Sequence, residues 1–232
     1  MEKNNKLYTL YSKLDVFGLV DEHNKSVKVR AKKAVFPLFI KTNESYEKAD
    51  KKIMIFGQET NRWGGIYGTG ITVEEILDKY ENFFNTKCCY SYAGQFWNGV
   101  KHFINSYKKK NSDISVDYLW NNIVKMGIDN KGFPYAFYEN IVKPNLNQLI
   151  NKEIEILKPD NIIFFTGPNY DEIIDDVFNK PDRIEIQGYT KRELCEIKIT
   201  NVKKAIRTYH PNYLYRNDID KYYKTIIKEF MK

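Results

Sequence analysis

The chain has 232 residues, of which 42% are hydrophobic and 29% charged. This much apolar material supports a packed core and excludes intrinsic disorder as the main state. No apolar run reaches the roughly 20 residues that a membrane-spanning helix needs, and the first residues lack the apolar stretch of a signal peptide. We therefore expect a cytoplasmic protein that has no membrane partner and is a monomer.

The cysteines and the net charge limit the possible ligands. Cys88, Cys89 and Cys195 provide neither a disulfide framework nor the CxxC spacing of a zinc or iron–sulfur site. We expect no metal and no other cofactor. Lys and Arg exceed Asp and Glu by 37 to 30, and the resulting charge of +7 is compatible with a polyanionic partner such as DNA.

The N-terminal 50 residues differ from the rest of the chain. They are basic and patchily apolar, and we interpret residues 1–50 as a helical extension packed on a main domain of residues 51–232. From residue 52 onward, segments rich in β-branched and aromatic residues predict four strands: Ile53–Phe56, Leu119–Val124, Asn161–Phe165 and Ala205–Thr208. Nearly continuous apolar runs such as IMIF and IIFF are typical of strands covered on both faces, as in a parallel sheet.

Helical patterns separate these strands. Thr72-Val-Glu-Glu75 is a capping-box sequence that predicts a helix through Phe84, and apolar residues on one helical face between 146 and 157 predict another that ends before Pro159. Two further helices are predicted at 171–178 and 219–231, and a hairpin feeding the last strand at 184–187 and 195–200. This order predicts an α/β fold of three layers, α/β/α, around a central, mostly parallel four-stranded sheet.

The segments that follow the strands carry the functional information, because ligands of doubly wound sheets bind beyond the carboxyl ends of the strands. Gly57-Gln58-Glu59 follows the first strand, and Asn121 and Asn122 lie in the second. Residues 166–170 follow the third strand, and Tyr209-His210-Pro211 follows the fourth. A carboxylate, amides and a histidine are thereby predicted at one rim of the sheet.

These segments, in this order, resemble the uracil-DNA glycosylase superfamily, most closely its bacterial and archaeal branches with a GEAPG-type first motif. Gly57-Gln58-Glu59 is similar to the start of the water-activating loop, GQDPYH in the best-known branch, and Asn122-Ile-Val-Lys125 to the NxxK stretch whose Asn reads the uracil edge. Residues 156–167 resemble the strand motif I-KP-xI-LLG. Residues 209–216, YHPNYLYR, resemble YHPSxLLR, the motif of the histidine and the DNA wedge. The resemblance covers roughly residues 50–230.

The chain also departs from the family's motifs. Met126 follows Lys125, and the four cysteine ligands of the iron–sulfur branch are absent, which agrees with the expectation of no cofactor. Gly127-Ile-Asp129 stands in place of RPPxNR, HPS has become HPN, and Glu59 replaces the Asp of the best-known branch.

The resemblance implies a DNA N-glycosylase that hydrolyses the N-glycosidic bond of uracil or a related deaminated base in base-excision repair. Such enzymes flip the base out of the stack and read its edge in a pocket. Because the bond breaks through an oxocarbenium-like sugar, a carboxylate is needed on the sugar side, as in glycoside hydrolysis. Hydrogen-bond donors are needed where negative charge develops on the base.

These requirements assign roles to individual residues. Glu59 would orient a water and stabilise the sugar cation, and His210 would donate to uracil O2. Asn122 would read the base edge, with Asn121 as the alternative, and Gln58 belongs to the same base-binding set. Phe96 would stack on the flipped base, and Tyr67 and Trp63 are the alternatives for that role.

The remaining candidates would contact DNA outside the base pocket. Lys125, Asn212 and Arg216 are predicted to meet the backbone, whereas the Lys108–Lys110 run is interpreted as a loop. Tyr213, Leu214 and Tyr215 would enter the minor groove as a wedge. Packing of these side chains on the core is the alternative.

Two rival functions remain at this stage. One is a catalytically inactive nucleic-acid or nucleotide-binding module on the same fold. The other is a small-molecule hydrolase, because a doubly wound sheet does not by itself fix an activity.

Overall fold

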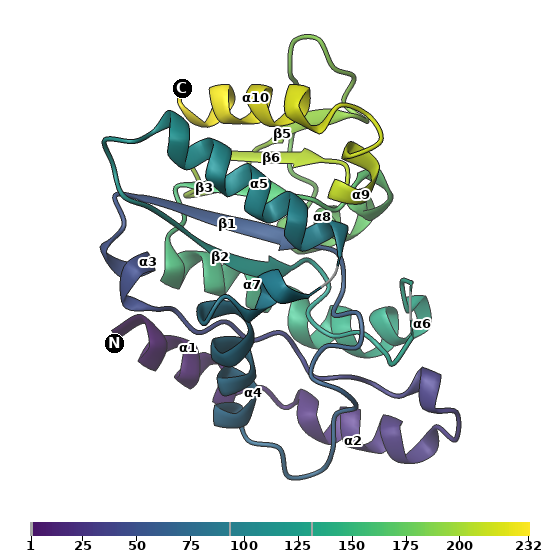
Figure 1. The fold of residues 1–232 in the computed structure, drawn as a ribbon. Helices are drawn as coiled ribbons and strands as arrows, with labels where there is room; N and C mark the ends of the chain where they lie inside the picture. The colour runs from purple at the N-terminus through teal and green to yellow at the C-terminus, as the bar shows by residue number, and fades with distance from the viewer. Residues whose placement is uncertain (1, 93, 131) are drawn as a thin grey trace.

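The computed structural model of the protein describes residues 2–92, 94–130 and 132–232, and it shows a β-sheet between layers of helices (Figure 1). Over these residues the sheet has six strands in the order β2-β1-β3-β6-β5-β4. The strands are β1 (Lys51–Gly57), β2 (Val116–Asn122), β3 (Asn161–Phe164), β4 (Arg183–Glu185), β5 (Leu194–Ile197) and β6 (Lys204–Thr208). The neighbours from β2 to β6 pair in parallel, and β5 and β4 pair antiparallel.

The structure confirms the α/β class and corrects the description of the sheet. The four predicted strands correspond to β1, β2, β3 and β6, and they form the parallel part. The predicted count of four is wrong, because the hairpin β4–β5 adds two antiparallel strands to the free edge of β6. A sheet edge has unpaired N–H and C=O groups, and a neighbouring hairpin satisfies them.

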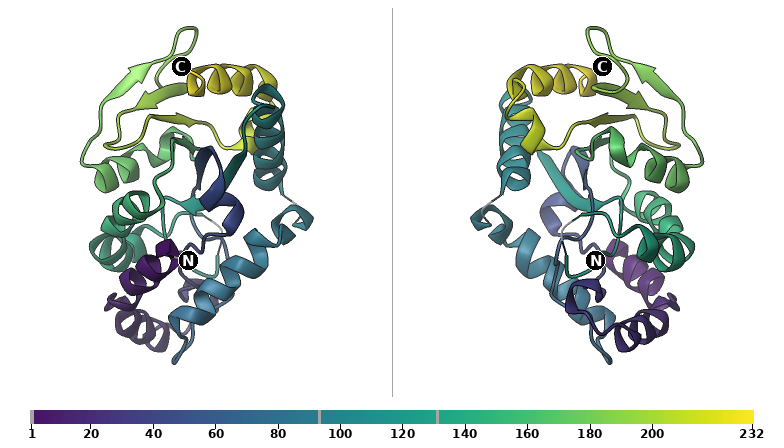
Figure 2. Two further views of the ribbon diagram at one scale, coloured as in Figure 1. Left: turned by 90° about the vertical axis from the view of Figure 1, so that its left-hand side faces the viewer. Right: turned by 90° about the vertical axis from the view of Figure 1, so that its right-hand side faces the viewer.

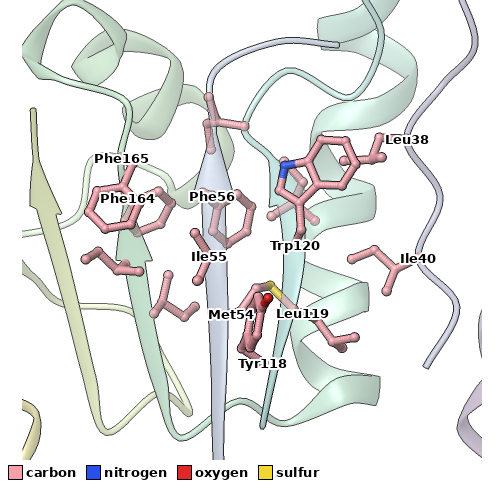
Figure 3. Packing of buried hydrophobic residues seen from close by; sticks show 14 of the residues in the cluster. Leu38, Ile40, Met54, Ile55, Phe56, Tyr118, Leu119, Trp120, Phe164 and Phe165 are labelled. Atoms are coloured by element: carbon pink, nitrogen blue, oxygen red, sulfur yellow. The ribbon is translucent and has the colours of Figure 1, made fainter. Parts of the chain in front are cut away.

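The parallel strands are buried because helices cover both faces of the sheet. Every residue of β2 and β3 is buried, as is β1 from Ile53 onward. Side chains of these strands pack against one another (Figure 3), and the rings of Phe56 and Phe164 stack with centroids 4.8 Å apart. The core therefore lies on both sides of the strands that lead to the candidate site.

The helices form layers on the two faces, with α5 and α10 on one face and α7 and α8 on the other (Figure 2). The longer helices are α1 (Glu2–Ser12), α2 (Val16–Ser26), α4 (Val73–Tyr80), α5 (Gln95–Lys110), α7 (Lys143–Leu157), α8 (Asp171–Phe178) and α10 (Ile219–Phe230). The short ones are α3 (Glu44–Lys48), α6 (Tyr135–Phe137) and α9 (Pro211–Leu214). No helix in the described parts of the chain is both long and apolar enough to cross a membrane.

The predicted capping box forms at the start of α4. The Thr72 hydroxyl accepts from the Glu75 backbone N–H at 3.2 Å, and the Glu75 carboxylate accepts from the Thr72 N–H at 2.7 Å. The helix continues through a π-helical turn, Glu81–Asn85. The predicted helices before Pro159 and at both later positions are likewise present as α7, α8 and α10.

Helix α5 was not predicted, and the Lys108–Lys110 run belongs to its last turn and not to a loop. Buried Trp97, Val100, Ile104 and Tyr107 recur at helical spacing, which is a signal that the sequence contains. Lysines are favourable at this end because the helix dipole is negative there. The N-terminus of α5 carries Phe96, so this helix also helps to form the site.

The N-terminal residues share the core of the sheet. Leu7 and Tyr11 of α1 and Val20 of α2 are fully buried in the same hydrophobic cluster as the strands. The segment between α2 and α3 runs alongside the loop after β2, where the Leu38 N–H donates to the Lys125 carbonyl at 2.8 Å. Residues 2–50 thus pack directly on the elements that support the site.

Candidate active site

A cleft of about 1010 Å³ lies at the carboxyl ends of β1 and β2. Its walls come from the loop after β1, the end of β2, the start of α5 and the segment after β6, together with residues of α4 and of the segment between α4 and α5. Six of the predicted site residues line it: Gln58, Glu59, Phe96, Asn122, His210 and Asn212. They come together because the carboxyl ends of parallel strands share one edge of the sheet.

Gly57, the last residue of β1, allows two of these side chains to approach the backbone. A Cβ at this position would lie 2.4 Å from Asn122 Oδ1 and 3.2 Å from Phe96 Cζ. Any larger side chain would therefore displace Asn122 and Phe96. The glycine brings the amide and the ring against the strand end.

Asn121 and Asn122 point to different environments, as expected for neighbours on a strand. Asn121 is fully buried, and its Nδ2 donates to Glu153 Oε2 at 2.8 Å. Asn122 lines the cleft, where its Oδ1 accepts from the Trp120 indole N–H at 3.2 Å. Of the two alternatives, only Asn122 is positioned to meet a ligand in this cleft.

Glu59 is partly buried and is paired with Tyr170, a residue of the segment after the third strand to which the sequence assigned no role. The Tyr170 hydroxyl donates to Glu59 Oε2 in a short hydrogen bond. Burial raises the pKa of the Glu59 carboxyl, and the hydrogen bond from Tyr170 acts in the opposite direction. Tyr170 belongs to the turn that follows β3, so a carboxylate from one strand end is held by a hydroxyl from another.

Gln58 links the same two loops. Its Nε2 donates to the Thr166 carbonyl at 2.8 Å, which ties the segment after β1 to the segment after β3. One end of the Gln58 amide is thus engaged in holding the loop that carries Glu59.

His210 lies at the start of α9 and is held in one neutral form. Its Nδ1 accepts from the Asn212 N–H at 3.1 Å, which requires the proton to be on Nε2. Burial lowers the pKa of His210 to about 4, so the ring is neutral at pH 7. The ring stacks on Phe96 with centroids 5.6 Å apart. The residue therefore offers a neutral Nε2–H donor beside an aromatic ring.

One wall of the cleft is a cluster of aromatic rings that contains all three tryptophans of the chain. Trp120 lies at its centre, with the ring of Trp97 at 4.9 Å and that of Trp63 at 5.2 Å, both edge to face. Phe83 lies 5.0 Å from Trp63. Flat apolar walls of this kind suit a planar ring. Of these four rings, only Trp63 is predicted from the sequence to lie at the site, as an alternative to Phe96.

Tyr67 is not part of the cleft. It is 3% exposed, stacks on Phe17 of α2 at 5.7 Å, and its carbonyl accepts from Asn24 Nδ2 at 2.9 Å. The assignment of Tyr67 to base binding is corrected, because it packs beneath the N-terminal helices.

Lys125 is also buried. Its Nζ lies 2.8 Å from both Glu153 Oε1 and Asn121 Oδ1, with the lysine 1% and the glutamate 0% exposed. Tyr11 of α1 donates to the same carboxylate at 2.8 Å. The predicted contact of Lys125 with DNA is corrected: an ion pair with this degree of burial holds the loop after β2 and does not reach a phosphate.

The two sides of α9 have different environments, so the predicted wedge residues do not all face outward. Leu214 is fully buried and belongs to the core, so its predicted insertion into DNA is corrected. Pro211 and Leu214 face inward at helical spacing, whereas Asn212, Tyr213 and Arg216 are exposed. Tyr213 is 39% exposed, and its ring lies 4.1 Å from that of Tyr209. The exposed part of this segment lies directly beside His210.

No group of three or more His, Cys, Asp or Glu side chains in residues 2–92, 94–130 and 132–232 could hold a metal ion. The three cysteines are free thiols. The side chains that line the cleft include the Glu59 carboxyl group, the amides of Gln58 and Asn122, and the neutral imidazole of His210.

The sequence matches no family model, and a search of curated proteins finds no match for it.

Proposed function

We propose that the protein is a DNA N-glycosylase that hydrolyses the N-glycosidic bond of uracil or a related deaminated base. The observation that carries this proposal is the convergence of Glu59, Asn122 and His210 from three strand ends around Phe96 in one cleft. A planar base between Phe96 and the opposite wall would place its polar edge near the amide and the imidazole. The motif resemblance on residues 57–59, 122–125 and 209–216 supports the same reading.

The side chains suit the two sides of the bond that breaks. Glu59 in its ionised form would orient a water toward the sugar C1′ and stabilise positive charge there. The C1′–N bond breaks with its electron pair going to the base. The water oxygen forms the new bond to C1′, and the proton that the water loses passes to the Glu59 carboxylate and finally replaces C1′ on the departing base. The neutral ring of His210 would donate its Nε2–H to the developing base anion. One such donor stabilises the transition state by about 3–4 kcal/mol.

The DNA would approach across a rim that carries basic and aromatic side chains. Arg62 and Lys79 line the cleft, and Tyr213 and Arg216 are exposed next to His210. The net charge of +7 favours a polyanion. A catalytically inactive nucleic-acid-binding module would use the same rim, and it is the alternative that the experiment has to separate.

The test is excision from labelled oligonucleotides that carry uracil, hypoxanthine, xanthine or no lesion, as single strands and duplexes. We expect abasic product from at least one deaminated base and none from unmodified DNA. A Glu59→Gln preparation purified in the same way controls for a contaminating enzyme. Strong, salt-dependent DNA binding without excision of any base would contradict the proposal and favour the non-catalytic module.

A further inference from the structure

The hydrogen bond between Trp120 and Asn122 fixes which end of the Asn122 amide faces the cleft. An indole N–H is only a donor, so the atom that it meets at 3.2 Å has to be the amide oxygen. Gly57 packs against the same oxygen, since a Cβ there would lie 2.4 Å from it. The acceptor end of the amide is therefore held against the wall of the cleft.

The nitrogen of the same amide, Asn122 Nδ2, faces the cleft. Asn122 Nδ2 makes no hydrogen bond with the described residues, although Asn122 is only 2% exposed and lines the cleft. Nδ2 is not one of the fully buried, unpaired side-chain atoms of the described residues, so it is open to the cleft and can meet an acceptor from a ligand or water. The amide thus presents N–H to the cleft.

Trp120 can hold the amide because its own position is fixed at two points. Its backbone N–H donates to the Tyr80 hydroxyl at 3.1 Å, and its carbonyl accepts from that hydroxyl at 2.9 Å. Its ring packs edge to face against Trp63 and Trp97. The indole N–H is consequently a rigid donor.

We propose that Trp120 is the positioning residue that sets base specificity in this cleft, by holding Asn122 so that a bound base meets a donor. A base with a carbonyl oxygen at that point, such as O4 of uracil, pairs with the amide. A base with an amino group there, such as N4 of cytosine, faces a second donor and leaves both groups unpaired. This inference rests on the proposed function for the identity of the ligand.

The experiment compares Trp120→Phe with a matched control, Trp97→Phe. Both changes remove one indole from the same cluster, but only the first removes the donor that holds Asn122, whose terminal torsion can then rotate. Affinities are measured for two single-stranded oligonucleotides that differ by uracil or cytosine at one position. All proteins carry Glu59→Gln, so that the base is retained during the measurement.

We expect the parent and Trp97→Phe to prefer uracil, and Trp120→Phe to lose about 10- to 100-fold of that preference. An unchanged preference in Trp120→Phe, or an equal loss in both variants, would overturn the inference. A purely structural role would weaken binding to both oligonucleotides and leave their ratio unchanged.

A second measurement does not depend on binding. Hydrogen exchange of the Trp120 indole proton, assigned by its loss in Trp120→Phe, is followed by NMR in the ligand-free protein. We expect Asn122→Ala to speed this exchange, and no change would overturn the inference.

A protein that shows the uracil preference but excises no base would contradict the proposed hydrolysis and leave the role of Trp120 intact.

Discussion

Two adjacent asparagines at the end of β2 lie in regions that handle polar groups in opposite ways. Asn121 enters a buried network with Glu153, Lys125 and Tyr11, in which the amide, carboxylate, ammonium and hydroxyl groups all have partners. Asn122 enters the cleft, where its Nδ2 has no partner among the described residues.

Paired polar groups and unpaired polar groups have different functions in these two regions. A fully paired network in the interior stabilises one arrangement of the chain, and here it links α1, β2 and α7. It also holds the base of the candidate site, because Asn121 Oδ1 accepts from the Asn122 backbone N–H at 2.8 Å. The cleft keeps unused hydrogen-bonding capacity, which is available to a ligand.

The largest effect is expected on the cleft side of the comparison. Glu59→Gln should lower the single-turnover rate of base excision about 10²- to 10⁴-fold, as for loss of an oriented general base. Its effect on the free energy of unfolding should be small, because Gln can still accept from Tyr170. Glu185→Gln, on the exposed strand β4, is the matched control and should excise at the parent rate. Near-normal excision by folded Glu59→Gln would remove Glu59 from the mechanism.

On the network side, Glu153→Gln should destabilise the protein by about 3–5 kcal/mol, because it leaves the buried Lys125 ammonium without a countercharge. Urea unfolding followed by circular dichroism measures the effect. The double variant Glu153→Leu, Lys125→Met removes both charges and should be markedly more stable than Glu153→Gln. A cost below about 1 kcal/mol for Glu153→Gln would show that the pair is not held as the structure has it.

His210 predicts a loss of stability in acid. Its pKa is lowered to about 4 in the folded state, whereas the value in the unfolded chain is about 6.5. Between these two pH values, His210 binds a proton in the unfolded chain but not in the folded protein. The free energy of unfolding should therefore fall as the pH drops through this window, by about 3 kcal/mol at most from this residue. Urea unfolding at pH 7 and pH 4.5 measures the fall. His210→Gln should show a smaller difference between the two, and an unchanged difference would contradict the burial of a neutral ring.

The smallest effect is expected from the hydrogen bond to Glu59. The Tyr170 hydroxyl favours the ionised carboxylate, so Tyr170→Phe should raise the pKa of Glu59 further. The acid limb of the pH–rate profile should move to higher pH, with about a tenfold loss of rate below it and an unchanged rate on the alkaline plateau. Tyr138→Phe is the matched control: the Tyr138 hydroxyl bonds to Asp176 and Asn147, so its removal should leave the acid limb in place. A uniform loss at all pH values would mean that Tyr170 positions the loop and does not tune Glu59.

Local sequence was sufficient for the parts of this protein that depend on neighbours along the chain. Apolar runs predict the buried strands, and the capping box predicts the start of α4. The residues after the strand ends are predicted to lie at one edge of the sheet. Gln58, Glu59 and His210 line the same cleft because parallel strands impose that geometry.

Contacts between distant segments were needed for the rest. A periodic pattern shows which face of an element a side chain lies on, but not what covers that face. The sequence therefore predicts DNA contacts for Lys125 and Leu214, whereas Lys125 pairs with Glu153 and Leu214 packs in the core. The hairpin could be recognised locally, but its addition to the edge of β6 depends on pairing across the sheet. The orientation of the Asn122 amide depends on the indole of Trp120, two residues earlier, and only the folded aromatic cluster holds that indole in place. A hydrogen bond needs both partners fixed in space, and closeness in the sequence is not sufficient.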